Sequence, residues 1–431
     1  MISRKPTIRR SLGTLIVSLA LFAFQFAVFA ASPVIESSDS RWAVHTAMSI
    51  AKGHGGDMTE YLPIIEQENN NNIEYLAGGP RNIYPIGPSL LAVPTVAIIA
   101  WLDPKWAEQL PKVRPLRTEQ LIASAIGASA GLVFYWVILY QFRSQAIALA
   151  SVAIFAFCTS IWSTATRGLW QHGPLVLMLV VAMLLLVRAR ERPPLVQYVG
   201  LPVAMAYLMR PTAIVAIIVL STYVMLRYRA WFVRYLCWAM LIAVPWCAFN
   251  LKIYHHLVPF YYHNNAFSEQ SRLVTGLLGN LFSPSRGLFV FSPVLLFSIS
   301  GFVLALRDRE QRPLNLAYGA IVAGNSIIIG EAHMWWGGHS FGPRFMTDIV
   351  PFLVYFTAFN FRLPETFRRR TQIAVSSVIA VLALASATIH AQGAFRYATW
   401  QWNVSPINID KAPSRAWDWH DPQFARTEQK E

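Results

Sequence analysis

Charged residues are scarce in this sequence. Only 13% of its 431 residues are Asp, Glu, Lys or Arg, while 55% are hydrophobic, and the mean hydropathy is +0.40. Soluble domains rarely carry so few charges. The scarcity therefore excludes an ordinary soluble protein, and repeated apolar stretches of about 17–25 residues predict an all-α polytopic membrane protein.

Acidic residues are fewer still, with 22 Asp and Glu against 36 Lys and Arg, which gives a net charge of +14. Such an excess could suit nucleic acid, but the basic residues sit in short clusters between apolar runs. This pattern is typical of loops beside an anionic membrane leaflet. We therefore expect a lipid bilayer as partner and no nucleic acid.

Cysteine is also rare. Cys158, Cys237 and Cys247 all lie in apolar segments, where they are expected to pack as small side chains rather than form disulfides or a metal site. An internal repeat is not evident, and the Asn run at 69–72 is expected at a loop tip.

The basic start MISRKPTIRR and the apolar run after it resemble a signal peptide, but the run is longer than a typical signal core. We interpret it as a retained first helix whose basic end lies in the cytoplasm. Further spans are predicted near residues 119–142, 144–163, 174–187, 195–209, 212–226, 233–250, 288–305, 314–330, 347–361 and 372–390.

Arginine clusters fall at every second gap between these spans, on the side of the N-terminus, as the positive-inside rule requires. The segment 87–102, which is short and contains Pro88 and Pro94, is then re-entrant or surface-lying. The layout has about eleven transmembrane helices in a bacterial inner membrane, with the C-terminus periplasmic. Residues 1–390 form the membrane domain, 32–118 its first periplasmic loop with juxtamembrane helices, and 391–431 a periplasmic tail.

The first loop opens with PVIESSDSRWAVH, where Asp39 and Arg41 follow the first span at once. A helix over about 40–52, ended by the glycines at 53–56, is expected to lie along the membrane surface. Capping of this helix is the ordinary interpretation of Asp39. The alternative is a catalytic carboxylate at the membrane surface.

Four arginines outside the cytoplasmic clusters are candidates to bind a phosphate, since a guanidinium can hold two of its oxygens at once. Arg81 and Arg344 lie on Gly–Pro turns, Arg286 precedes a span, and Arg210 lies between two apolar half-length segments. A charge in that last place is expected to face a polar cavity. Snorkelling to lipid headgroups is the alternative for Arg81.

Other polar side chains of the outer loops are candidates for substrate binding. Arg41 lies in the first loop, Arg167 and His172 lie in TRGLWQHGP, and Glu331 and His339 lie in GEAHMWWGGHSFGPRFMTD. The spacing of Glu331, His333 and His339 matches no compact metal motif, which favours a hydrogen-bonded cavity wall over a metal site. A divalent metal remains an alternative.

These motifs resemble those of GT-C glycosyltransferases, in the branch of the protein O-mannosyltransferases and the aminoarabinose transferase of lipid A. DSRWAVHTAMSIAKGHG resembles the acidic opening of the family's surface helix, YPIGPSLLAVP its proline-rich segment, and RGLWQHGPLVLMLVVAMLLL its turn into the fourth helix. SPSRGLFVFSP and WWGGHSFGPRFMTD resemble motifs of uncharacterised bacterial members. The resemblance covers about residues 1–360.

The resemblance implies a GT-C-like fold with an active site in the first outer loop, and a polyprenyl-phosphate sugar as donor. The product would be an inverted glycosidic linkage on an envelope glycan, lipid or protein. Asp39 stands where the family places its catalytic carboxylate, the general base. Arg81 and Arg344, followed by Arg210 and Arg286, would hold the departing phosphate, and no resident cofactor is implied.

Two positions depart from the family pattern. Ser40 stands where many relatives carry a second acid, which Asp57, Glu60 or Glu74 could replace. Tyr84 stands before Pro85 where relatives often have a lysine.

Two other functions stay open. A transporter or flippase of lipid-linked sugars predicts charges within several spans or paired halves, whereas Arg210 is nearly alone. An O-antigen polymerase or ligase would hold its key residues in a late outer loop. The loop at 251–287 contains candidates for this role, namely His255, His256, His263, Arg272 and Arg286.

Overall fold

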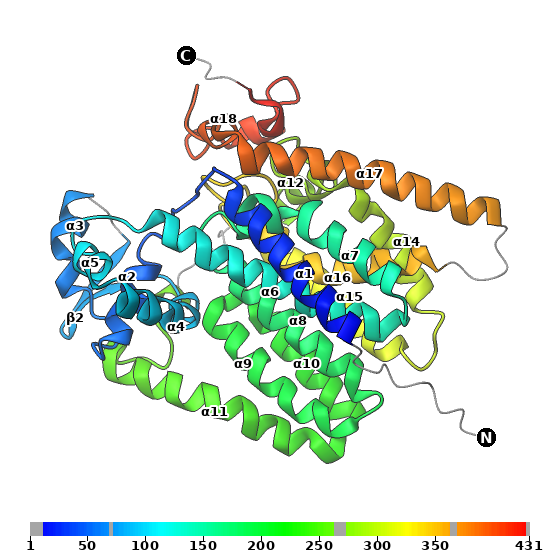
Figure 1. Cartoon of the computed structure of the whole chain (residues 1–431), viewed down its shortest axis with the longest axis horizontal. Coiled ribbons are helices and arrows are strands. Elements are labelled where there is room, and N and C mark those ends of the chain that lie inside the picture. Colours follow the sequence, from blue (N-terminus) through cyan, green and yellow to red (C-terminus); the bar gives the residue numbers. More distant parts are fainter. Residues whose placement is uncertain (1–11, 69–71, 263–272, 363–368, 428–431) are drawn as a thin grey trace.

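The computed structural model describes residues 12–68, 72–262, 273–362 and 369–427, and it is almost entirely helical (Figure 1). The basic N-terminal residues, His263, Arg272 and most of the Asn run lie outside the described residues. The fold class expected from the sequence, an all-α membrane protein, is confirmed.

The α-helices are α1 (Leu12–Ala31), α2 (Ala43–Ala51), α3 (Leu62–Gln67), α4 (Gly87–Leu102), α5 (Pro104–Gln109), α6 (Leu116–Phe142), α7 (Gln145–Phe157), α8 (His172–Ala189), α9 (Gly200–Met209), α10 (Ile214–Arg227), α11 (Arg229–Tyr254), α12 (Leu273–Phe282), α13 (Leu288–Phe291), α14 (Phe297–Ala305), α15 (Arg312–Gly330), α16 (Val350–Thr357), α17 (Arg369–Phe395) and α18 (Tyr397–Gln401). Short helical turns are η1 (Thr59–Tyr61), η2 (Ile161–Ala165), η3 (Pro193–Val199), η4 (Pro211–Ala213), η5 (Phe260–Tyr262), η6 (Pro293–Leu296), η7 (Arg344–Ile349), η8 (Ala358–Phe361), η9 (Pro413–Trp417) and η10 (Gln423–Ala425).

Every predicted span contains helix. Within the described part of the chain, six helices are long and apolar enough to cross a membrane, namely α1, α6, α8, α11, α15 and α17. Several other spans are broken: the span predicted at 288–305, for example, consists of α13, η6 and α14, because Pro293 cannot donate the backbone hydrogen bond that would continue a helix. The total of about eleven crossings and the side of each terminus stay predictions.

The long helices form a bundle with a buried centre and an apolar outside. In the apolar stretches of α6 and α8, 67% of the residues are buried, against 11% in α11 and 17% in α1 and α17. Outer helices therefore turn bare apolar side chains outward, such as Leu241 and Val244 on α11 and Leu384 on α17. In a bilayer these faces meet lipid.

The first outer loop packs as a unit at one end of the bundle, at the left of Figure 1. Its elements α2 to α5 share an apolar core with α6 that includes Trp42, Met58 and Ile122. Seven of the nine residues of α2, from Ala43 to Ser49, are buried. This differs from the one-sided membrane-surface helix that the sequence predicted, because α4 packs on the face expected to meet lipid.

The same loop holds a feature that the sequence analysis did not predict. Strands β1 (Ile73–Leu76) and β2 (Gly79–Asn82) form an antiparallel hairpin in which Glu74 faces Arg81. Gly79 has a φ of +100°, which suits the tight turn because glycine has no Cβ. The hairpin fixes Arg81 on a strand.

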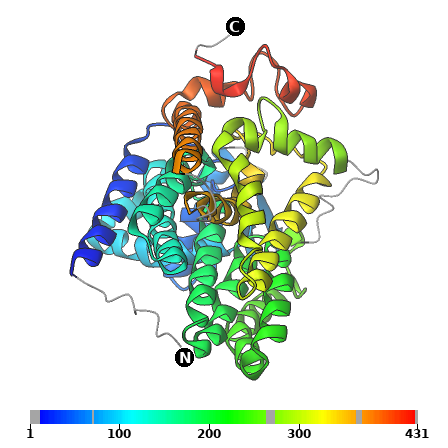
Figure 2. The same cartoon turned by 90° about the vertical axis from the view of Figure 1, so that its right-hand side faces the viewer.

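The C-terminal tail lies at the edge of the bundle beyond α17, at the top of Figures 1 and 2. Helix α17 continues past residue 390 to Phe395, so the tail begins later than expected. Its Trp402, Ile409 and Ala416 share a small buried core with Trp335 and Trp336 of the loop before η7.

Candidate active site

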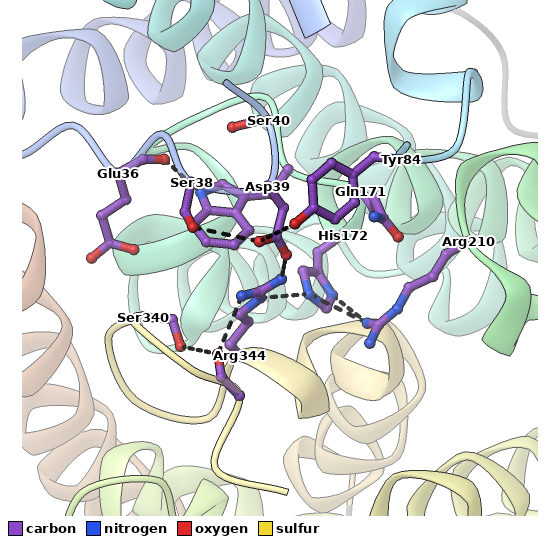
Figure 3. Close-up of polar contacts among 12 residues, drawn as sticks. Glu36, Ser38, Asp39, Ser40, Tyr84, Gln171, His172, Arg210, Ser340 and Arg344 are labelled. Atoms are coloured by element: carbon purple, nitrogen blue, oxygen red, sulfur yellow. Dashed lines mark hydrogen bonds and ion pairs between the residues drawn. The ribbon is translucent and has the colours of Figure 1, made fainter. Parts of the chain in front are cut away.

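Asp39 lies in the turn between α1 and α2 and does not cap α2. That helix begins at Ala43, with Trp42 as its N-cap residue and no side-chain cap hydrogen bond. The Asp39 carboxylate turns instead toward two distant residues. Tyr84 donates its hydroxyl to Oδ1 at 3.1 Å, and Arg344 forms an ion pair with Oδ2 (Figure 3). The side chain is 18% exposed, so a substrate can still reach it.

Arg344 lies at the start of η7, and its guanidinium stacks on the Trp170 ring. Its guanidinium carbon lies 3.9 Å from the ring centroid of Trp170, a distance that suits cation–π stacking. One of its outer nitrogens donates to the Gly337 carbonyl at 3.2 Å, and Nε donates to Nε2 of His172 at 3.4 Å. Arg344 therefore links the first loop to the turn before α8.

His172 continues the network toward Arg210. Its Nδ1 lies 2.7 Å from Oδ1 of Asp348, and Nη1 of Arg210 donates to the other Asp348 oxygen at 2.7 Å. Both Asp348 and His172 are buried. With Nδ1 protonated toward Asp348, Nε2 keeps the lone pair that accepts from Arg344. Arg210 lies at this point because the chain turns there between α9 and α10.

The other side of Asp39 is aromatic. Tyr84 packs edge-on against Tyr261 with 5.5 Å between ring centroids, and Gln171 donates to the Tyr261 hydroxyl at 3.3 Å. Burial and then the charge of Asp39 raise the pKa of Tyr84 above its usual value. Tyr84 therefore stays protonated and remains a donor to Asp39.

A cavity of about 370 Å³ adjoins this cluster. Arg210 and Thr212 form its polar part, and its remaining walls are aromatic or aliphatic, with Tyr207, Tyr261, Tyr262, Ile214, Ile328, Ile329 and Phe345 among them. A space with one cationic corner and apolar walls suits an amphiphile with an anionic head.

Glu36 lies behind Trp170 and is 1% exposed. Its carbonyl accepts from the Trp170 indole at 2.7 Å, and its amide donates to the Arg167 carbonyl at 3.0 Å. No side chain among the described residues donates a hydrogen bond to its carboxylate, which lies near the Phe341 backbone. Burial raises the pKa of Glu36 to about 8, against the opposing charges of Arg167, Arg344 and Arg286. The carboxyl is therefore mostly neutral at neutral pH.

The first loop is fastened to the turn before α8 by Glu119 of α6. This buried carboxylate accepts hydrogen bonds from Ser40, from Ser37 at 2.7 Å and from the Leu169 amide at 2.9 Å. Gly168 lies in the same contact, where a Cβ would come within 2.1 Å of the Glu36 carbonyl oxygen. Ser40, where the resemblance led us to expect a second acid, thus contacts a carboxylate supplied by α6.

The structure brings together Asp39, Arg344, Arg210 and His172 of the residues that the sequence predicted. The others lie elsewhere. Arg81 pairs with Asp57 at 3.2 Å, and Arg41 pairs with Glu68 at 2.9 Å. The roles assigned to these two from the sequence stay predictions, but neither contacts the Asp39 cluster directly.

Arg167, Arg286, Glu331 and His339 also have other surroundings. Arg167 donates to the carbonyls of Phe29 and Ser32, where α1 ends. Arg286 and His339 contact the C-terminal tail, and Glu331 caps the end of α15.

Several residues of the cluster were not chosen from the sequence as site residues. Asp348 and Trp170 lie within motifs that were already singled out, next to Arg344 and His172 in the chain. Their closeness in sequence to Arg344 and His172 was the signal that could have identified them. No sequence signal marked Glu119 as a site residue, because an acid in the first turn of a helix is commonplace.

Convergence of three or more His, Cys, Asp or Glu side chains that could hold a metal is not found within the described ranges. The arrangement of the cluster can instead do two things. A carboxylate at its centre can accept a proton, and the two arginines beside it can stabilise an anion.

Comparison with known proteins supports the fold. No protein-family model matches the chain, and no curated protein matches its sequence. Two solved structures of ArnT from Cupriavidus metallidurans share its fold. The one bound to undecaprenyl phosphate aligns with a TM-score of 0.56 at 13% identity, over 96% of this chain and 75% of ArnT. The apo structure aligns with a TM-score of 0.57 at 14% identity, over 90% and 68%. The resemblance to the GT-C fold is therefore confirmed.

Proposed function

We propose that this chain is an integral membrane glycosyltransferase. It transfers a sugar from a polyprenyl-phosphate donor to an envelope glycan, lipid or protein at the periplasmic face of a bacterial inner membrane. One observation carries the proposal: the carboxylate Asp39 lies against Arg344, next to a cavity with Arg210 in its polar corner. The shared fold with ArnT, which was solved with undecaprenyl phosphate, supports the donor class.

The reaction is a direct displacement at the anomeric carbon. Asp39 accepts the proton of an acceptor hydroxyl while the hydroxyl oxygen bonds to that carbon from one face. The bond from the carbon to the phosphate oxygen breaks on the other face, and its electron pair stays on the phosphate. The product has inverted configuration, because the two events occur on opposite faces.

Arg344 and Arg210 stabilise the departing phosphate. Phosphate is already a good leaving group, so fixed cations suffice without an acid to protonate it. Arg344 is paired with Asp39. A donor phosphate competes for this guanidinium, and the Asp39 carboxylate then becomes available to the acceptor. Donor binding therefore precedes activation of the base.

The two alternative functions gain no support from the structure. Arg210, the charge that a transporter would use within its spans, is engaged with Asp348 and His172 in the same cluster as Asp39. In the late outer loop, His263 and Arg272 lie outside the described residues, and Arg286 is buried against the C-terminal tail.

The test is mass spectrometry of envelope glycolipids and polysaccharides from a strain that lacks the gene. Wild type is expected to restore a sugar-sized mass, whereas Asp39→Asn, expressed at a normal level, does not. Asp103→Asn is the matched control, because Asp103 accepts from the Trp106 amide and caps α5 of the same loop. Full restoration by Asp39→Asn would show that the base lies elsewhere.

A further inference from the structure

We propose that the C-terminal tail helps to form the site and that its Gln423 is a positioning residue for Arg344. Gln423 belongs to η10 and is fully buried. Its contacts reach the loop of residues 337–344, at whose end Arg344 meets Asp39. The effect on sugar transfer rests on the proposed function; the effect on the loop does not.

Gln423 holds this loop at two backbone groups. Its Oε1 accepts from the Gly342 amide at 2.9 Å, and its Nε2 donates to the Ser340 carbonyl at 2.9 Å. Nε2 also donates to the Thr399 carbonyl at 3.0 Å. Both ends of the amide are therefore used, which requires a neutral side chain with a donor and an acceptor.

The loop needs such a support because its own backbone is irregular. Gly337, Gly338 and Gly342 have φ values of +74°, +62° and +61°, which belong to the left-handed region that glycine adopts most easily. Arg344 in turn donates to the Gly337 carbonyl at 3.2 Å. A shift of residues 340–342 thus moves the guanidinium relative to Asp39.

Arg286 fixes Gln423 itself. The guanidinium is buried and donates to Gln423 Oε1 at 2.6 Å and to Asn403 Oδ1 at 2.7 Å, both on the tail. It also donates to the carbonyls of Trp336 at 2.5 Å and Gly338 at 3.1 Å. Its hydrogen bonds thus tie the tail to the loop, a use that differs from the phosphate binding predicted from the sequence.

Gln423→Met tests the proposal, because methionine keeps the volume and removes the hydrogen bonds. Hydrogen exchange of residues 339–345 is expected to accelerate in the purified, lipid-reconstituted protein. Affinity for undecaprenyl phosphate and the donor KM are expected to worsen on the order of tenfold, since small misplacements of a binding group are costly. The acceptor KM stays unchanged, a split that a merely structural loss of active protein would not give.

Two further variants make the result decisive. Asp421→Asn removes a carboxylate whose ion pairs with Arg415 and Arg426 lie inside the tail, and it should behave as wild type. Gln423→Glu keeps the acceptor for Gly342 but loses the donor, so its effect should lie between wild type and Gln423→Met. It also serves if Gln423→Met does not fold.

Wild-type exchange and donor affinity in Gln423→Met, or equal effects of Gln423→Met and Asp421→Asn, would overturn the positioning role. A wild-type protein that neither binds undecaprenyl phosphate nor transfers a sugar would overturn the proposed function instead. In that case the exchange of residues 339–345 still decides whether Gln423 fixes the loop.

Discussion

The Arg81–Asp57 and Arg344–Asp39 ion pairs differ in how far apart their partners lie along the chain. Arg81 and Asp57 belong to one loop, and Asp57 also accepts from the Thr59 amide at 2.7 Å. Arg344 and Asp39 are 305 positions apart, and their contacts extend to His172 and beyond. The local pair stabilises the β1–β2 hairpin, whereas the distant pair joins two segments of the candidate site.

The two pairs also differ in the size of the cavity beside them. Arg81 borders a hollow of about 20 Å³, room for little more than a water molecule. The cluster of Arg344 adjoins the cavity of about 370 Å³ that Arg210 and Phe345 line. Under the proposed function the larger cavity favours the second pair as the site of a lipid phosphate, and matched substitutions test this comparison.

The largest contrast is expected between Arg344→Lys and Arg81→Lys. Lysine keeps the charge but loses the planar fork and the stacking on Trp170. For Arg344→Lys, kcat/KM should fall on the order of 10²–10³, as for other groups that stabilise developing charge. For Arg81→Lys the loss should stay within about threefold, because the hairpin tolerates a less directional cation. Kinetics with a polyprenyl-phosphate sugar measure both, and equal losses would put the donor phosphate at the hairpin as well.

A smaller effect is expected from Asp348→Asn, which leaves the Arg210 charge without its carboxylate. Removing one partner of a buried pair costs about 3–5 kcal/mol of unfolding free energy, and a misplaced Arg210 should lower activity about tenfold or more. Thermal unfolding and donor affinity measure these two effects.

The double variant Asp348→Asn/Arg210→Gln separates the two consequences. With both charges gone, most of the stability should return, whereas activity should stay low because the phosphate has lost Arg210. If the double variant is as unstable as Asp348→Asn alone, the ion pair is not the source of the loss.

The smallest effect concerns pH and Glu36, whose pKa is raised from 4.5 to about 8 by burial. The folded protein holds the proton more tightly than the unfolded chain. The stability that this provides is fully present below pH 4.5 and is lost as pH rises toward 8. Each pH unit in this window removes at most about 1.4 kcal/mol.

Glu36→Gln should abolish this pH dependence, because glutamine does not titrate. Unfolding of wild type and variant, measured from pH 5 to pH 8, should show a difference in stability that changes with pH in favour of the variant. A difference that is the same at every pH would mean that Glu36 is ionised throughout.

The sequence was sufficient for most of the helical layout, because each long apolar run has only one way to satisfy its backbone in lipid. It also pointed to Asp39, Arg344, Arg210 and His172 as separate candidates. It did not pair them, since contacts between residues as distant as Asp39 and Arg344 leave no local pattern.

Arg286 and Arg344 show why the sequence could not distinguish the arginines near Asp39 from arginines with other partners. Both arginines lie in turns rich in small residues close to an apolar helix. Their difference lies in their partners, because Asn403 and Gln423 reach Arg286 from a tail more than a hundred residues later in the chain. Ser40 is a similar case, since its carboxylate partner Glu119 belongs to α6.

Gly168 sets a practical limit for anyone who wishes to redesign this protein. A methyl group there would meet the backbone of Glu36 at 2.1 Å and the Glu119 carboxylate at 3.0 Å, so even alanine would push the backbone of Glu36 away from the turn before α8. Under the proposed function, variation intended to change the range of substrates belongs instead at Tyr84 and Tyr261, whose rings border the cluster from one side. A library that keeps residue 168 as glycine retains the scaffold while the pocket changes.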